Sequence, residues 1–292
     1  MKNTNLSPVG YLCIGHCCHD LVGGGHILGG TAAYAGLVAQ RLGLNVGILT
    51  SVGPEFEFSR VFEEHGVQFC SKTAQKTTVF ENIYHSDIRT QFLHERAETL
   101  YPADVPEVWK TAGIVQFCPI ADEVDFSLLR AFPGALTAAT IQGWLRRWDE
   151  KGKVSPKAMD WQQLVSVDII VMSDADIAGF ESAIPEIASC VRVLVITQGA
   201  HGARVFCNGS ELFFPSFPVQ ETDATGAGDV FATAFILKYA EKKDITEASS
   251  FAHVAASFVV EGVGINNMDA LGKIQERLEK YQSLISKHDL HR

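Results

Sequence analysis

The sequence lacks the features that mark membrane, secreted and nucleic-acid-binding proteins. No apolar run approaches the length of a membrane span, so we expect no membrane partner. Met1–Asn5 leads into no signal-peptide core, which favours a cytoplasmic protein. Basic residues are few, with 24 Lys and Arg against 34 Asp and Glu, and the net charge of −10 argues against a nucleic-acid partner. A small phosphate ligand is compatible with this charge, because backbone amides can hold it.

A disulfide framework and a zinc site are also missing from the pattern. The seven cysteines are an odd number and follow no secretion signal, which predicts reduced thiols. Residues 13–20 gather three cysteines and two histidines, but no second Cys/His pair with zinc-ligand spacing follows. We therefore expect Cys13 and Cys17 on a strand, as small buried apolar side chains.

A P-loop is absent as well. The glycine-rich stretch Gly23–Thr31 nearly has P-loop spacing, but Gly30 stands where that motif requires lysine. Its glycines do not directly follow a long apolar strand, as they would in a dinucleotide-binding fold. Gly29 and Gly30 instead predict a close-approach turn into a tightly packed helix that begins at Thr31–Ala35. The alternative is that they serve helix–sheet packing alone.

The most informative segment is Thr222–Asp229, which is followed at once by the apolar run Val230–Phe235. This pattern predicts a helix that begins at the loop, and the amides and dipole of a helix N-terminus favour an anion. A carboxylate at Asp229 would be repelled by a bound phosphate, so its position needs another reason. Proton abstraction from a substrate hydroxyl beside a phosphoryl group is such a reason. An ordinary glycine-rich turn with an acidic helix residue is the alternative.

Short apolar runs alternate with amphipathic segments along the chain. The expected strands are Val9–Ile14, Val46–Thr50, Gly113–Phe117, Asp168–Met172, Val191–Thr197 and Ala203–Cys207. The expected helices are Thr31–Leu42, Phe58–His65, Phe126–Ala131, Asp176–Cys190 and a packing helix with apolar residues three or four apart from Leu271 to Ile285. This alternation predicts an α/β fold with a mainly parallel, buried central sheet, in a single domain over residues 1–292.

One region breaks the alternation. Thr77–Tyr84 and Thr90–Glu95 alternate polar and apolar residues around Ser86–Ile88, which predicts a hairpin. Together with the segment near Asp20–Ile27 it would form a small β lid, over about residues 17–28 and 77–96. An exposed hairpin edge invites pairing, so we expect a homodimer through Thr77–Glu95.

Three motifs resemble those of the ribokinase-like (PfkB) carbohydrate kinases, in the same order and at fitting separations. Gly29–Ala35 with the later Leu42-Gly43 is similar to the N-terminal signature, and Asp223–Asp229 to the C-terminal signature. Thr197–Ala203 resembles the nucleotide-contacting strand and turn. The resemblance covers essentially the whole chain. It implies a three-layer α/β/α fold with a small β lid, and ATP-dependent phosphorylation of a hydroxyl.

The resemblance also implies roles for individual residues. Asp229 would be the base that accepts the hydroxyl proton. The backbone amides of Gly226, Ala227 and Gly228 would stabilise charge on the phosphoryl oxygens. Asp20 would hydrogen-bond substrate hydroxyls, and Gly29 and Gly30 would lie against the substrate as lid hinges. The residues expected at the nucleotide are Thr197, Gly199, Gly202 and Thr225. Mg²⁺ would bridge the phosphates, since it needs few protein ligands.

The departures from the family pattern concern the substrate and the metal. Tyr34 stands where ribokinase has an asparagine that would contact sugar hydroxyls, which puts a ribose-type pocket in doubt. Ser173–Asp176 replaces an Asn-x-x-Glu motif, and Asp176 keeps a carboxylate for a water-mediated metal contact. Gln142–Arg146 resembles a Gln-Gly-x-x-Arg stretch. With Asp20 and Tyr34 it is similar to plant inositol-kinase-like members, so a cyclic polyol or a modified sugar is as plausible as a pentose.

Some alternatives stay open at this point. Arg89 on the hairpin is a candidate for contacting substrate, although a solvated hairpin face explains it equally well. Segment 144–148 reads as amphipathic, with its apolar side in the core. A nucleoside kinase of the same family and a catalytically degenerate sensor that binds a sugar or nucleotide are the rival functions.

Overall fold

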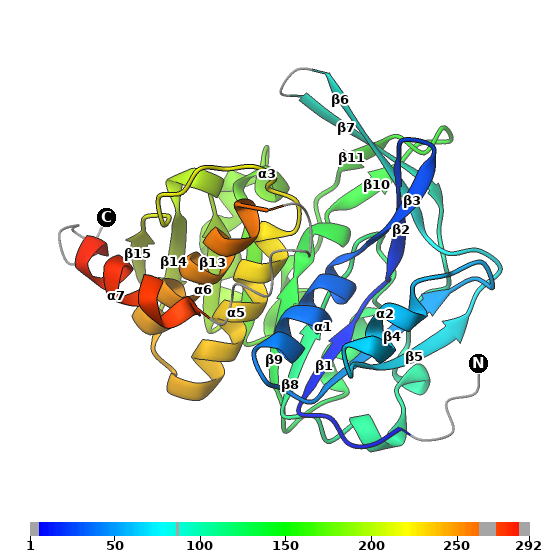
Figure 1. The fold of residues 1–292 in the computed structure, drawn as a ribbon, viewed down its shortest axis with the longest axis horizontal. Helices are drawn as coiled ribbons and strands as arrows, with labels where there is room; N and C mark the ends of the chain where they lie inside the picture. Colours follow the sequence, from blue (N-terminus) through cyan, green and yellow to red (C-terminus); the bar gives the residue numbers. More distant parts are fainter. Residues whose placement is uncertain (1–5, 86–87, 263–272, 286–292) are drawn as a thin grey trace. The chain divides into compact units, whose positions relative to one another are not determined.

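The computed structural model of the protein describes residues 6–85, 88–262 and 273–285 (Figure 1). The chain divides into two compact units, each described here by itself. Unit 1 comprises Met1–Gln40 and Asn45–Asp160, and unit 2 comprises Arg41–Leu44 and Trp161–Arg292. Within the described ranges, no helix is both long and apolar enough to cross a membrane.

The main sheet of unit 1 is parallel, as its apolar runs predict. Its strands lie in the order β9-β8-β1-β4-β5, and each neighbouring pair is parallel. The bounds are Tyr11–Ile14 (β1), Val46–Val52 (β4), Gln68–Thr73 (β5), Ile114–Phe117 (β8) and Leu136–Thr140 (β9). All of β4 is buried, as expected for a strand covered on both faces. The loops that follow the strands therefore leave the sheet at one edge.

Helix α1 (Thr31–Arg41) packs closely on this sheet. Its residues from Thr31 to Ala39 are buried, and a Cβ at Gly36 would lie 2.5 Å from Cδ1 of Ile48 on β4. The glycine thus lets the helix backbone approach the strand. The next helix, α2, is short and spans Ser59–Glu64.

A second, four-stranded sheet in unit 1 contains the predicted hairpin. Its order is β3-β2-β6-β7, with antiparallel pairs β2–β3 and β6–β7 joined by the parallel pair β2–β6. The bounds are Cys18–Val22 (β2), Gly25–Gly29 (β3), Val79–His85 (β6) and Ile88–Glu95 (β7). Figure 1 shows both hairpins extending away from the main sheet of unit 1. Residues 86–87 lie outside the described residues, and so do the side chains of residues 84–89.

Unit 2 combines four strands with three long helices. Strands β12 (Ile169–Ser173) and β13 (Val193–Thr197) are parallel, and β14 (Ala203–Cys207) and β15 (Ser210–Phe214) continue the sheet antiparallel. The long helices are α5 (Ala227–Lys242), α6 (Ile245–Val260) and α7 (Ile274–Ile285). Helix α6 packs against both α5 and α7.

Three local predictions are wrong, two of them for helices. The helix predicted over Asp176–Cys190 is broken into α3 (Asp174–Ile177), a 3₁₀ turn (Glu181–Ala183) and α4 (Ile184–Cys190). Gly179 has φ 84° after α3, and a proline lies in the first turn of α4. The helix predicted over Phe126–Ala131 is a 3₁₀ turn over Phe126–Arg130.

Segment 144–148 was expected to be amphipathic, with its apolar side in the core. Trp144 is buried, and Arg146–Trp148 forms strand β10, paired with β11 (Val154–Pro156). The remaining error concerns Cys17. Cys17 was expected on a strand and instead lies between β1 and β2, because the chain turns there into the second sheet. Both Cys13 and Cys17 are fully buried, as predicted.

Candidate active site

Helix α5 begins at Ala227, within the loop where the sequence predicts a helix start. Gly226 is the N-cap residue and has φ 80°, a left-handed conformation that favours glycine. Because the N-cap residue is glycine, it makes no side-chain capping hydrogen bond. A Cβ at Gly228 would meet nothing within 4 Å, so open space lies beside this residue. Asp229 lies in the same first turn, which places a carboxylate next to the amide end of a 16-residue helix.

One of the three amides assigned to the anion hole already has a partner. The amide of Ala227 donates to the carbonyl of Ala224 over 3.1 Å, within the turn that precedes the helix. The amide of Val230 donates to Gly226, as the first regular helical bond does. The amide of Gly228, beside open space, is therefore better suited to receive an anion than that of Ala227.

The loop before α5 is held by backbone contacts. The amides of Thr222 and Asp223 donate to the carbonyl of Val260 at the end of α6, over 2.7 and 3.2 Å. The Asp223 carboxylate then accepts the amide of Thr225 over 2.9 Å, which closes an Asx turn. Thr225 is exposed in this turn. These contacts fix the path by which the chain enters α5.

The turn after β13 supplies the residues expected at the nucleotide. Thr197 ends the strand, and the 3₁₀ turn Gly199–His201 leads into β14. A Cβ at Gly202 would lie 2.1 Å from the carbonyl oxygen of Phe214, so this glycine is required for packing against β15. Gly199 has φ 54° with open space beside it. Gly202 thus has a structural role, and Gly199 leaves the surface of the turn clear.

Asp176 is held by a capping box at the start of α3. Its Oδ2 accepts hydrogen bonds from the amide and the hydroxyl of Ser173, over 2.8 and 2.7 Å. Ser173 pairs with Thr197 across β12 and β13, so α3 begins next to the end of the nucleotide strand. The Oδ1 atom takes part in neither bond. Among the described residues, no group of three or more His, Cys, Asp and Glu side chains could hold a metal ion.

In unit 1, Asp20 and Gly29 are in direct contact. Asp20 lies on β2 and is half-buried, and Gly29 ends β3 opposite Cys18. A Cβ at Gly29 would lie 2.2 Å from Oδ2 of Asp20. The glycine therefore makes room for the carboxylate. The thiol of Cys18 lies 3.8 Å from the other carboxylate oxygen, and burial, then the charge of Asp20, raises the pKa of this thiol.

Gly30 forms the turn between the second sheet and α1. It has φ 98°, and a Cβ there would lie 2.3 Å from the carbonyl oxygen of His16. Its own carbonyl accepts the amides of Ala33 and Tyr34 in the first turn of α1. Tyr34, a candidate for the substrate pocket, is 6% exposed in the first turn of α1. Arg89 lies on β7, and its side chain is outside the described residues.

The structure adds a contact that was not assigned to the site from sequence. Gln142 donates from its amide to the hydroxyl of Thr31 over 2.9 Å, and Arg146 donates to the Gln142 carbonyl oxygen over 2.6 Å. Arg146 also lies over the ring of Phe80, the β6 residue that pairs with Asp20. The Gln-Gly-x-x-Arg stretch thus links the start of α1 with the strands around Asp20. Its motif was the available signal in the sequence.

Comparisons with known proteins show what the chain is similar to. The family model "pfkB family carbohydrate kinase" matches residues 154–270. The chain is 25% identical over 303 residues to inositol 3-kinase of Oryza sativa subsp. japonica, covering 94% of this chain and 75% of the relative.

Two solved structures share the fold. One is a pyrophosphate-dependent myo-inositol-1 kinase converted into a myo-inositol-3 kinase, with TM-score 0.76, 21% identity and coverage of 93% and 99% of the two chains. The other is Arabidopsis thaliana ribokinase complexed with ribose and ATP, with TM-score 0.74, 20% identity and coverage of 94% and 99%. The predicted three-layer α/β fold of the ribokinase type is confirmed.

Proposed function

We propose that this chain is a kinase of the ribokinase-like pfkB type that transfers a phosphoryl group from ATP to a hydroxyl of a small cyclic polyol or sugar, because the pfkB family model matches residues 154–270 and inositol 3-kinase of rice is similar over most of the chain. The observation that carries the proposal is the start of α5. There a helix N-terminus with a glycine N-cap, open space at Gly228 and the Asp229 carboxylate occur within one turn. An anion site and a base are the two parts that phosphoryl transfer to a hydroxyl requires.

In this proposal Asp229 accepts the proton of the acceptor hydroxyl, while the oxygen of that hydroxyl forms a bond to the γ-phosphorus. The bond between that phosphorus and the bridging oxygen of the donor breaks, and ADP leaves with the electron pair. The amides at Gly226, Ala227 and Gly228 stabilise negative charge on the transferring oxygens, which is where electrostatic catalysis gains most. Because Ala227 is already engaged with Ala224, the Gly228 amide has the larger share.

The donor would be held by the turn after β13. Thr197, Gly199, Gly202 and Thr225 are the residues proposed at the nucleotide, and the clear surface at Gly199 supports this. Mg²⁺, when bound, would neutralise charge on the phosphates. Oδ1 of Asp176 is a hard oxygen outside the capping-box bonds, and it fits an ion that keeps most of its waters. Pyrophosphate is the alternative donor, since one structural relative is named pyrophosphate-dependent.

Acceptor recognition is assigned to unit 1. Asp20 would accept hydrogen bonds from hydroxyls, with Gly29 keeping the space around its carboxylate and Gly30 shaping the turn. Arg89 is a further proposed contact from β7. The buried Tyr34 provides no amide for sugar hydroxyls, and the likeness to inositol 3-kinase of rice favours a cyclic polyol over a pentose.

The test measures product formation from myo-inositol, ribose, fructose and cytidine, with ATP or pyrophosphate as donor. Asp229→Asn should lower kcat by about 10² to 10⁴, the usual loss for a general base. Glu247→Gln is the matched control, because Glu247 is the acidic residue in the first turn of the neighbouring helix α6. If Asp229→Asn keeps a turnover near that of the wild type, Asp229 is not the base. Acceptor binding by the wild type with no product from any pair would favour a sensor.

We also propose a homodimer through Thr77–Glu95 of the four-stranded sheet. Strand β7 is at one end of this sheet, and part of its edge is used, since the amide of Leu93 donates to the carbonyl of Gly152. The remaining edge toward residue 88 is where a second copy would pair. Light scattering should give twice the monomer mass, and a monomer at assay concentration would contradict the proposal.

A further inference from the structure

The loop after β8 contains a fully buried carboxylate with a complete set of backbone donors. Glu123 has no exposed surface. Its Oε1 accepts the amides of His16 and Ile120, over 2.9 and 3.0 Å. Its Oε2 accepts the amides of Ile120 and Ala121, over 3.0 and 2.6 Å. Burying a carboxylate is costly, and these bonds offset the cost by tying it to two separate segments of unit 1.

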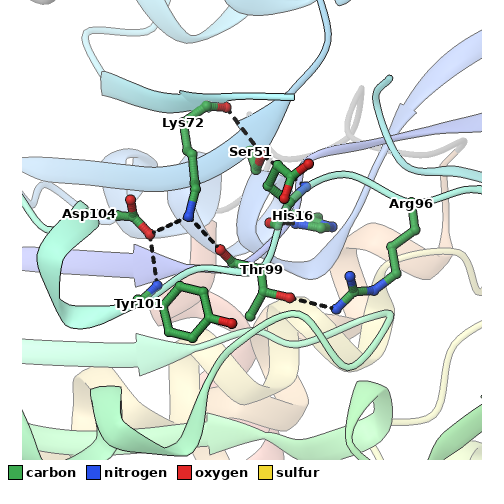
Figure 2. A network of polar contacts seen from close by, with 8 residues as sticks. His16, Ser51, Lys72, Arg96, Thr99, Tyr101 and Asp104 are labelled. Atoms are coloured by element: carbon green, nitrogen blue, oxygen red, sulfur yellow. Dashed lines mark hydrogen bonds and ion pairs between the residues drawn. The ribbon is translucent and has the colours of Figure 1, made fainter. Parts of the chain in front are cut away.

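The carbonyl groups of the same loop are held by a positive charge. Nε of Arg96 donates to the carbonyl of Ala121, and Nη2 donates to that of Asp122, both over 2.8 Å. Arg96 directly follows β7, and its Nη2 also donates to the hydroxyl of Thr99 over 3.0 Å (Figure 2). The loop over residues 120–123 therefore has its amides on a carboxylate and its carbonyls on a guanidinium, which fixes its path.

The His16 ring completes the network in its neutral form. Nε2 lies 2.9 Å from the carbonyl of Glu98, which can only accept, so this nitrogen carries the proton. Nδ1 then accepts from the hydroxyl of Thr78, over 2.7 Å. The Thr78 hydroxyl also accepts a hydrogen bond from the amide of Ala97, and the backbone carbonyl of Thr78 accepts one from the amide of His19. Glu98 and Thr99, which bond to His16 and Arg96 respectively, are consecutive residues.

These bonds connect Glu123 to the residues that the proposed function gives to the acceptor. The His16 amide is held by Glu123, while its carbonyl oxygen would lie 2.3 Å from a Cβ at Gly30. His19 directly precedes Asp20 on β2, and its amide donates to the carbonyl of Thr78. A shift of His16 would thus move both the Gly30 turn and the strand that carries Asp20.

We infer that Glu123 is a positioning residue for the acceptor: through His16 it sets Asp20 and the Gly30 turn where they meet substrate hydroxyls. The inference rests on the proposed function. Glutamine at this position would keep the volume but would replace one acceptor oxygen by an NH₂ group, which would face backbone N–H donors. A misplacement of about 1 Å far from the chemistry can cost about 10²-fold in rate.

The experiment compares Glu123→Gln with Glu107→Gln, an exposed control that loses an i,i+3 ion pair with Lys110. With myo-inositol, or the panel compound that the wild type phosphorylates best, Glu123→Gln should raise the acceptor KM and lower kcat/KM for the acceptor by about 10²-fold. The donor KM should stay within about twofold, because the donor residues belong to unit 2. Loss of folded enzyme alone would lower kcat and leave both KM values unchanged, and that result would overturn the inference.

Amide hydrogen exchange supplies a readout that needs no turnover. Glu123→Gln should speed exchange in peptides covering residues 14–34 and leave residues 169–207 unchanged, whereas unchanged exchange in 14–34 overturns the inference. A wild type that phosphorylates no panel compound would count against the proposed function, and the exchange result would still decide the positioning role. Should Glu123→Gln fail to fold, Thr78→Val takes its place. It keeps every bond of the carboxylate, removes the partner of Nδ1 of His16, and carries the same expectations.

Discussion

Lowering the pH should destabilise unit 2 through one buried histidine on α6. His253 is 6% exposed, stacks on Tyr281 at 5.8 Å between ring centroids, and meets Phe231 edge to face at 4.9 Å. Its Nε2 has no hydrogen-bond partner among the described residues. Burial lowers the pKa of His253 from 6.5 to about 3, and only a hydrogen bond to the backbone of Phe214 opposes the shift. At moderately acidic pH, His253 is therefore protonated only in the unfolded chain.

The sign and size of the effect follow from linkage. Below pH 6.5 the unfolded chain binds a proton at His253 that the folded chain excludes, so the free energy of unfolding falls as the pH drops from 6.5 toward 3. At pH 7 the contribution is near zero. At pH 5 the pH is 1.5 units below the pKa of His253 in the unfolded state, while His253 in the folded state is still unprotonated. The free energy of unfolding is therefore lower by about 2 kcal/mol.

The assay is urea denaturation followed by circular dichroism at pH 7 and pH 5, for the wild type and His253→Phe. Phenylalanine keeps the aromatic contacts and removes the titrating group, so the variant should lose about 2 kcal/mol less than the wild type between the two pH values. The comparison between variants is needed because burial also lowers the pKa of His16 and His19. His94→Gln, at an exposed site, is the control. Equal losses in the wild type and His253→Phe would refute the reasoning.

Three further predictions concern the glycines and the metal. Gly29→Ala should push the Asp20 carboxylate aside and lower kcat/KM for the acceptor by about 10²-fold at an unchanged donor KM, measured by steady-state kinetics. Gly202→Ala, at φ 120° and 2.1 Å from the Phe214 carbonyl, should lower the free energy of unfolding by about 2–3 kcal/mol in urea, whereas Gly209→Ala, at φ 75° in open space, should lose about 1–2 kcal/mol. Asp176→Asn should raise the Mg²⁺ concentration needed for half-maximal activity about 10-fold. Ser173→Ala breaks the same capping box and should leave that concentration unchanged. If both variants shift it equally, Asp176 acts only as part of the helix cap.

The parts of the fold that the sequence predicted are those in which burial leaves a local trace. Strands β1 and β13 are almost entirely apolar runs, because a parallel sheet is covered on both faces. Strand β5 was missed because its residues are mostly half-buried and polar at an end of the sheet. Strand β9 was missed because it consists largely of Ala and Thr. In both cases the position in the sheet, which no local pattern contains, decides the structure.

The same distinction explains which site residues could be proposed from the sequence. Asp229 could be proposed because the glycine turn, the helix start and the carboxylate occupy eight consecutive positions, so one window of sequence contains the whole chemical argument. The contact between Asp20 and Gly29 depends on the β2–β3 register, and the role of Glu123 depends on a bond to a residue 107 positions away. An acidic residue in an Asp-Glu-Val stretch is ordinarily exposed, and only the fold turns this one into a buried acceptor of backbone amides. If Glu123 positions the acceptor strand, then changes in acceptor specificity should arise from the loop at residues 119–123 as readily as from residues that touch the substrate, since Arg96, Arg146 and His16 all bond to that loop.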